Sequence, residues 1–262
     1  MTNSYKKSLD QLFEKLLYYR HISGRINKVF QKEIEQYSSD TAIIHFASAL
    51  IISDWTGPNE NGWDINFHSG ITTETTKDNY KSEIEKIHSR QLCLLYAQSF
   101  ESFERFLKDC LFERLGQDDN FRKSVITLLP KNQNSSITRA KMPGGDHLFK
   151  ALKKAGGASF KDFTSKNNLN IKFKELWTVL SEVRHAITHN ESMIELKLVN
   201  KSEYHSDIFN YLFNSKSVSD DFLLIELDYG KFEKLIKRFS EFAFQIFKLL
   251  SIEEHIEWKK TE

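Results

Sequence analysis

The sequence predicts a mainly α-helical fold, and three observations lead to that prediction. Only 10 glycines and 3 prolines occur among 262 residues, so few residues interrupt regular structure. Residues with good helix propensity, above all Lys, Glu and Leu, are abundant. Apolar residues also recur every three to four positions along several segments, which is the spacing of a helix face buried on a core.

Residues 4–37 are predicted to form one long helix, or a pair of helices with a kink at Ser23-Gly24. Residues 41–53 form a short buried element, either a helix or a strand, because periodicity does not separate the two over so short a run. Residues 55–79 are rich in Gly, Asn, Thr and Asp. We interpret them as a loop with room for a short hairpin.

Residues 79–115 are predicted to form a long central helix that ends at Gly116. Its apolar face comprises Leu92, Leu95, Tyr96, Ser99, Phe103, Phe106, Leu107 and Cys110. The only two cysteines, Cys93 and Cys110, both lie on this helix. The intervening turns separate them by about 25 Å along the axis, so they are too far apart for a disulfide.

Three further helices are predicted in the rest of the chain, at residues 146–155, 170–189 and 230–252. Between the last two, residues 193–200 and 222–229 alternate apolar and polar side chains and have the pattern of a small antiparallel ribbon. We therefore expect a main helical domain over residues 79–255. Residues 1–78 are expected to be a helical extension and loop packed on it.

The charge balance sets limits on partners and location. A net charge of +1 gives no overall preference for nucleic acid, so any RNA affinity must come from a local patch. No leader-like segment is recognisable, and no apolar run approaches the roughly 20 residues of a membrane span. We therefore expect a protein of the reducing cytoplasm, without membrane association.

The segment "EVRHAITHN", residues 182–190, closes the predicted helix at 170–189. At about 100° per residue, Arg184 falls about 40° from Leu180, inside the stripe expected to be buried. A charged group at a core angle is costly unless it is paired. Arg184 therefore needs an anionic side chain, a path to the surface, or a ligand. A structural ion pair is the plain alternative to a functional role.

His185 and His189 fall on the opposite side of the same helix, about 140° and 180° from Leu180. Their spacing of four residues also suits a metal site, but the sequence offers no evident third ligand, neither HExxH nor CxxC. A metalloprotein using these two residues is the weakest of the hypotheses. Two surface histidines without a role are the remaining alternative.

The stretch "RHAITHN" resembles the Arg-x4-His motif of HEPN domains, small α-helical domains of many toxins and phage-defence ribonucleases. In that family a polar residue follows the arginine, here His185, and an asparagine often follows the histidine, here Asn190. The helices "FKELWTVLSEV" and "LLYAQSFESFERFLKDCL" are similar to the two central helices of the family. An aromatic-Glu pair is typical of the latter, and both Phe100-Glu101 and Phe103-Glu104 offer one. The resemblance covers residues 79–252.

This resemblance implies a HEPN-like helical bundle that cleaves RNA without a metal or another cofactor. His189 would act as general acid and base, and Arg184 would bind the scissile phosphate. His185 and Asn190 would orient these groups. Attack by the 2′-hydroxyl would leave 2′,3′-cyclic phosphate and 5′-hydroxyl ends. Glu104 lies nearer the apolar face of its helix than Glu101 does, so Glu104 is the predicted partner of Arg184.

On a straight helix Arg184 and His189 diverge by about 140° and 7.5 Å. The resemblance therefore implies a homodimer whose two motifs face each other. Lys131, Arg139 and Lys141, in a polar loop at residues 130–145, are candidate RNA contacts. An antitoxin or another defence-system protein is a further expected partner. The rival hypothesis is a HEPN-like module that binds a nucleotide or a partner protein without catalysis.

Overall fold

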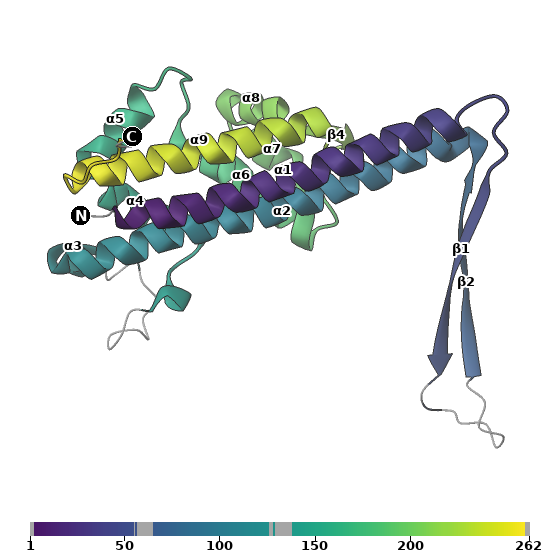
Figure 1. Ribbon diagram of the computed structural model, residues 1–262, viewed down its shortest axis with the longest axis horizontal. Coiled ribbons are helices and arrows are strands. Elements are labelled where there is room, and N and C mark those ends of the chain that lie inside the picture. The colour runs from purple at the N-terminus through teal and green to yellow at the C-terminus, as the bar shows by residue number, and fades with distance from the viewer. Residues whose placement is uncertain (1–2, 55, 57–64, 126–127, 129–137, 260–262) are drawn as a thin grey trace. The chain divides into compact units, whose positions relative to one another are not determined.

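A computed structural model of the chain describes residues 3–54, 56, 65–125, 128 and 138–259 (Figure 1). The fold is mainly α-helical, as the sequence predicts. The helices are α1 (Ser4–Tyr37), α2 (Lys77–Gln117), α3 (Asp119–Val125), the 3-10 turn η2 (Arg139–Lys141), α4 (Gly145–Ala155), α5 (Gly157–Ser165), α6 (Phe173–His189), α7 (Leu196–Val199), α8 (Glu203–Leu212) and α9 (Tyr229–Glu253). The strands are β1 (His45–Asp54), β2 (Ile65–Thr76), β3 (Met193–Glu195), β4 (Asn214–Ser217) and β5 (Phe222–Glu226).

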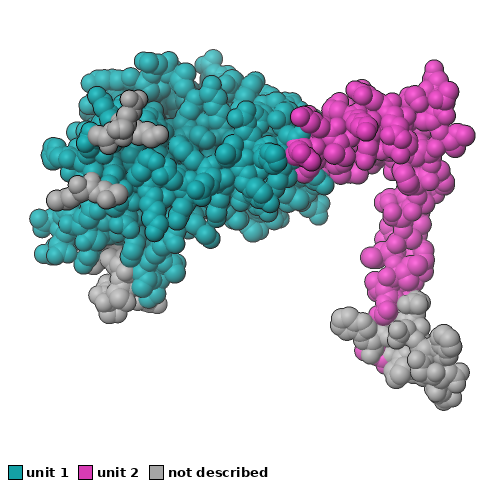
Figure 2. Space-filling model, in the orientation of Figure 1, with its two compact units in different colours: residues 1–24, 89–262 teal, residues 25–88 magenta. Residues whose placement is uncertain are grey.

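The chain divides into two compact units, coloured separately in Figure 2. Unit 1 comprises residues 1–24 and 89–262, and unit 2 comprises residues 25–88. This division differs from the expected boundary at residue 78, because the first turns of α1 belong to unit 1. Their buried side chains Tyr5, Leu9, Leu12 and Leu16 recur every three or four residues and join the core of that unit.

Aromatic side chains from three helices meet at the centre of unit 1. Phe103 of α2 is fully buried, and its ring lies 5.4 Å from Phe239 and 5.3 Å from Phe242, both on α9. The same ring lies 6.3 Å from Trp177 of α6. Most of the abundant phenylalanine of the sequence therefore serves as core, and it holds α2, α6 and α9 in fixed register.

The N-terminal part of α1 lies beside α9, which is yellow in Figure 1. Arg20 donates to Glu233 at 2.8 Å, and Asn3 donates to Ser251 at 2.9 Å. Helix α1 is continuous through Ser23 and Gly24, so the alternative of two kinked helices is wrong. A Cβ at Gly24 would come within 3.2 Å of the Tyr229 hydroxyl, so the glycine permits close contact with the start of α9.

A small antiparallel sheet precedes α9, with strand order β3-β5-β4. The predicted pairing is confirmed where Met193 aligns with Leu224 and Glu195 with Phe222. The predicted strand at residues 193–200 is too long, because its second half forms α7. Helix α8 and strand β4 lie between the predicted strands, in a stretch for which the sequence analysis made no prediction.

Unit 2 contains the antiparallel hairpin β1-β2. The prediction of a buried element at residues 41–53 is wrong, because the described side chains of β1 are exposed. The segment 55–79 was expected to be a loop with room for a short hairpin. The loop interpretation is wrong for residues 65–76, which form strand β2, and a hairpin is present but pairs β2 with β1. The run Ile71–Thr76 of β2 is rich in threonine, whose β-branched side chain favours a strand.

Two smaller expectations can be compared with the structure. Cys93 and Cys110 are free, as their spacing on one helix predicts, and both are buried. Burial raises the pKa of the Cys93 thiol to about 12. Among the residues described, none of the helices has a stretch sufficiently long and apolar to span a membrane.

Candidate active site

Helix α6 carries the Arg-x4-His segment, and its contacts with α2 include a buried hydrogen bond and an aromatic pair. The Tyr96 hydroxyl of α2 donates to the Leu180 carbonyl at 2.6 Å. The Trp177 ring lies 5.3 Å from Phe100. Burial raises the pKa of Tyr96 well above its usual value, which keeps its hydroxyl protonated as a donor. The two contacts fix the rotation of α6 about its axis, and therefore the direction in which Arg184 points.

Arg184 starts at the edge of the buried stripe and ends at the surface. Its side chain is 28% exposed, and its Nη2 donates to Glu101 Oε1 of α2 at 3.0 Å. Its Nε is buried and has no hydrogen-bond partner within the described part of the chain. The aliphatic stem thus crosses apolar surface while the charged end reaches an ion pair near solvent.

The predicted pairing of Arg184 with Glu104 is wrong, because Glu101 is the partner. Glu104 instead pairs with Lys108 at 2.9 Å, one turn further along α2. It also lies under Gly144, where a Cβ would come within 2.9 Å of its carboxylate. The prediction assumed an internal partner for an internal arginine. Since the guanidinium extends to the surface, it meets the glutamate that points outward.

His185 and His189 lie together on the exposed face of α6. Their ring centroids are 4.8 Å apart, with 46° between the ring planes. Helix α6 continues through Thr188 to His189, and the Thr188 hydroxyl donates to the Arg184 carbonyl at 2.9 Å. Arg184 and His189 therefore keep the separation of a straight helix, about 140° around the axis and 7.5 Å along it.

A tight turn follows the motif and fixes the end of α6. The backbone N–H of Asn190 donates to the Ala186 carbonyl at 3.0 Å, and the Asn190 side chain is exposed. Glu191 and Ser192 both have positive φ, 52° and 69°, a conformation that costs energy for residues other than glycine. The buried Ser192 hydroxyl accepts a hydrogen bond of 2.6 Å from Arg90 of α2, which holds the turn in place.

Glu182 is a residue of this segment to which the sequence analysis gave no role. It precedes His185 by three residues and His189 by seven, so all three lie on one face of α6. Partial burial raises the pKa of the Glu182 carboxyl, Asp146 raises it further, and Lys201 opposes the change. The carboxyl is therefore closer to neutral than an exposed glutamate would be.

The candidate RNA contacts that the structure describes, Arg139 and Lys141, lie on η2 and not on α6. The third candidate, Lys131, falls outside the described residues. Arg139 of η2 makes two hydrogen bonds to the buried carboxylate of Asp109 on α2, which raises the pKa of the guanidinium. Asp109 is eight residues, or about 12 Å, beyond Glu101 along α2. Lys141 is exposed on the same turn. RNA binding by these residues stays a prediction.

The motif residues do not line the cavity between α9 and the segment joining α5 to α6. That cavity has a volume of about 600 Å³, and its lining includes Leu169, Phe242 and Lys248 but neither Arg184 nor His189. Within the ranges that the structure describes, no group of three or more His, Cys, Asp and Glu side chains is placed to hold a metal ion. The candidate site is therefore a surface site built from Arg184, His185, His189 and Glu101.

Comparison of this chain with protein-family models, with curated proteins and with solved structures finds no match.

Proposed function

We propose that this chain is a metal-independent endoribonuclease of the HEPN type, acting in the cytoplasm as a toxin or phage-defence effector. The observation that supports this most is the ion pair between Arg184 and Glu101, at 3.0 Å. It joins the two sequence features of the resemblance, which lie 83 residues apart in the chain. Phe100 packs on the helix that carries the motif, and Glu101 holds the motif's arginine.

Arg184 is suited to bind a phosphate. A guanidinium has five N–H donors in a planar fork, and the hydrogen bond to Glu101 occupies one of them. Non-bridging phosphate oxygens accept such hydrogen bonds in pairs. As negative charge grows on these oxygens in the transition state, a positioned guanidinium stabilises it. Glu101 keeps the group oriented before the RNA binds.

His189 supplies the proton transfer. Imidazole titrates near neutral pH, so it can accept the proton of the ribose 2′-hydroxyl as that oxygen attacks phosphorus. The bond from phosphorus to the 5′-oxygen breaks, and that oxygen takes up a proton. The products are a 2′,3′-cyclic phosphate and a 5′-hydroxyl. The step consumes no water and uses no metal ion. His185 and Asn190 flank His189 and orient it or the phosphate.

Two copies of the chain are required to bring these groups to one phosphate. Within one copy, Arg184 and His189 diverge by about 140° around α6. A two-fold axis near the end of α6 would place the Arg184 of one copy opposite the His189 of the other. The active species of this proposal is therefore a homodimer.

The test is digestion of total RNA by purified wild-type chain and by the variants Arg184→Ala and His189→Ala, all with EDTA present. We expect cleavage by the wild type, 2′,3′-cyclic phosphate ends, and a loss of at least about a hundredfold in each variant. The control is His21→Ala, which removes an exposed histidine of α1 far along the chain from the motif. It should cleave like the wild type.

Other outcomes contradict the proposal in distinct ways. Cleavage that EDTA abolishes would indicate metal-dependent chemistry. Equal cleavage by the wild type and by His189→Ala would remove the role of His189. If neither the wild type nor any variant cleaves RNA, and if over-expression of the wild type and His189→Ala affects growth alike, a binding module without catalysis is favoured.

A further inference from the structure

The β1-β2 hairpin of unit 2 has one strongly apolar face. Cross-strand pairs lie on the same face, and Ile52 aligns with Phe67 while Phe46 aligns with Thr75. By the alternation of side chains along each strand, Leu50 and Ile71 point to this side as well. These five large apolar side chains, between 50% and 73% exposed, define the apolar face: Phe46, Leu50, Ile52, Phe67 and Ile71.

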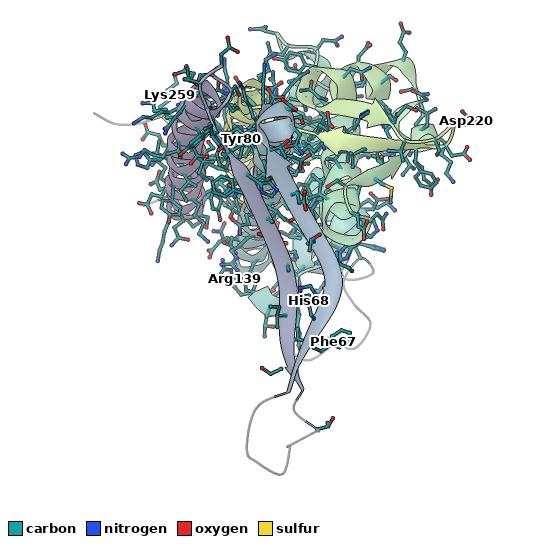
Figure 3. The ribbon with its side chains drawn as sticks, turned by 90° about the vertical axis from the view of Figure 1, so that its right-hand side faces the viewer. Phe67, His68, Tyr80, Arg139, Asp220 and Lys259 are labelled. Atoms are coloured by element: carbon teal, nitrogen blue, oxygen red, sulfur yellow. The ribbon has the colours of Figure 1, made fainter. Side chains whose placement is uncertain are left out.

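The opposite face carries the titratable groups of the described hairpin side chains. His45 and Glu74 approach to 3.6 Å there, and the Ile51 of β1 aligns with His68 of β2. Phe67 and His68, labelled in Figure 3, are neighbours on β2 and therefore belong to opposite faces. The backbone N–H of Gly70 donates to His68 Nδ1 at 3.0 Å, and Gly70 has φ of +73°, so this pair shapes the irregular register between Ala49 and Ile51.

An isolated two-stranded hairpin is marginally stable in water, and a second layer on its apolar face is the usual remedy. None of the five side chains that define the apolar face is charged. The strand register places Asp54, which aligns with Ile65, at the end of the same face, two residues beyond Ile52. A second copy of the face can cover the five apolar side chains, none of which carries a charge to be removed from water. A charged partner would gain nothing from these five side chains, because they present no opposite charge.

The five side chains of the apolar face offer more than half of the area that a stable dimer needs. A side chain of this size presents roughly 150–200 Å² when fully exposed. At the exposed fractions of the apolar face, the five side chains offer about 500 Å² per copy. Neighbouring Ser48, Thr73 and Thr75 add to this, toward the roughly 800 Å² per partner of a standard interface.

We infer that the apolar face of the β1-β2 hairpin is a self-association surface, which packs against the same face of a second copy of this chain as two layers about 10 Å apart. The interface is symmetric, so each side chain on it is used twice. This inference concerns a surface other than the Arg184 site and does not depend on the chain being a ribonuclease.

Two adjacent residues of β1 give a matched test. Ile52 is 50% exposed on the apolar face, and Ile51 is 58% exposed on the opposite face. In sedimentation of the full chain over a range of concentrations, we expect Ile52→Glu to raise the dissociation constant about a hundredfold, because the symmetric interface buries the new charge twice. Ile51→Glu should change it less than about threefold. A monomeric wild type, or equal effects of both changes, would overturn the inference.

A second experiment measures association of the hairpins alone, whether or not the Arg184 surface also dimerises. Ile52→Cys and Ile51→Cys are each treated with a short bis-maleimide linker; native Cys93 and Cys110 are buried and react slowly. The inference predicts linked dimers at position 52 and few at position 51. Equal linking at both positions, or linking at 51 alone, would contradict it. Far-UV circular dichroism confirms that each variant keeps its helices.

Discussion

The α2–α6 contact and the β1-β2 hairpin differ in how far their apolar side chains are shielded from water. In the first, the apolar residues at the contact, such as Phe100, Phe103 and Trp177, are buried, and charged groups such as Arg184 reach the surface. In the second, Phe46, Ile52 and Phe67 are exposed on a hairpin of two strands. The difference indicates that one copy of the chain is sufficient to bury the core of the helical unit, whereas the hairpin has an uncovered apolar face.

The largest expected difference between the two regions is in stability. Phe103→Ala removes a fully buried ring that packs on two other helices, α6 and α9, and should lower the free energy of unfolding by about 3–5 kcal/mol. Phe67→Ala, on the exposed face of the hairpin, should change it by less than about 0.5 kcal/mol in the monomer. Urea unfolding followed by helical circular dichroism compares the two. Similar losses would show that the hairpin is part of the same cooperative core.

An ion pair of the helical unit should likewise contribute more to the free energy of unfolding than an ion pair of the hairpin. Asp109 is buried, and Arg139→Ala would leave its carboxylate without a strong donor, which costs about 1–3 kcal/mol. The His45–Glu74 pair of the hairpin is exposed on both sides, so Glu74→Ala should have no measurable effect on unfolding. A stability loss below about 0.5 kcal/mol for Arg139→Ala would refute the structural role of Arg139.

A smaller effect sharpens the assignment of Glu101. A double-mutant cycle between Arg184→Ala and Glu101→Ala should give a coupling free energy of about 0.2–1 kcal/mol, as expected for an ion pair at the surface that is partly exposed. The same cycle with Glu104→Ala is the control and should give a value near zero, since Glu104 pairs with Lys108. Coupling to Glu104 in place of Glu101 would reverse the assignment.

The smallest effect concerns the pH dependence of stability. The folded-state pKa of Glu182 lies above its usual value of 4.5, mainly because of burial. The folded chain thus holds this proton more tightly than the unfolded chain, and stability falls as pH rises from 4.5 through the folded-state pKa. Glu182→Gln should therefore be more stable than wild type near neutral pH, with the difference closing as pH falls to about 4. A difference independent of pH would show that Glu182 titrates normally.

How well the sequence predicts this fold depends on the element. Helices α2, α4, α6 and α9 follow from apolar spacing, because each buries a stripe that repeats every three to four residues. At strand β1, the apolar run Leu50–Ile52 predicts a buried helix or strand, because such a run normally lies in a core. Its side chains are exposed because the hairpin has only two strands, and a single sequence does not reveal how many layers cover a strand.

The sequence predicts on which face of α6 each motif residue lies, but not which side chain Arg184 contacts. Helical spacing alone places Arg184 at the edge of a buried stripe and the two histidines on the opposite face. Helical spacing does not show whether the end of a long side chain reaches the surface, so the sequence favours Glu104 over Glu101 as the partner of Arg184. Helical geometry also keeps Arg184 and His189 apart, and the structure of one copy leaves that separation unchanged. The shared site of a homodimer is therefore the central claim of the account.

The most direct test is to mix the purified variants Arg184→Ala and His189→Ala and measure RNA cleavage. Each alone should be inactive. If one copy supplies Arg184 and the other His189, a mixed dimer contains one intact site. Free exchange in an equal mixture would then restore about a quarter of wild-type activity. Failure to restore activity, with subunit exchange shown independently by a fluorescent label, would contradict the shared site.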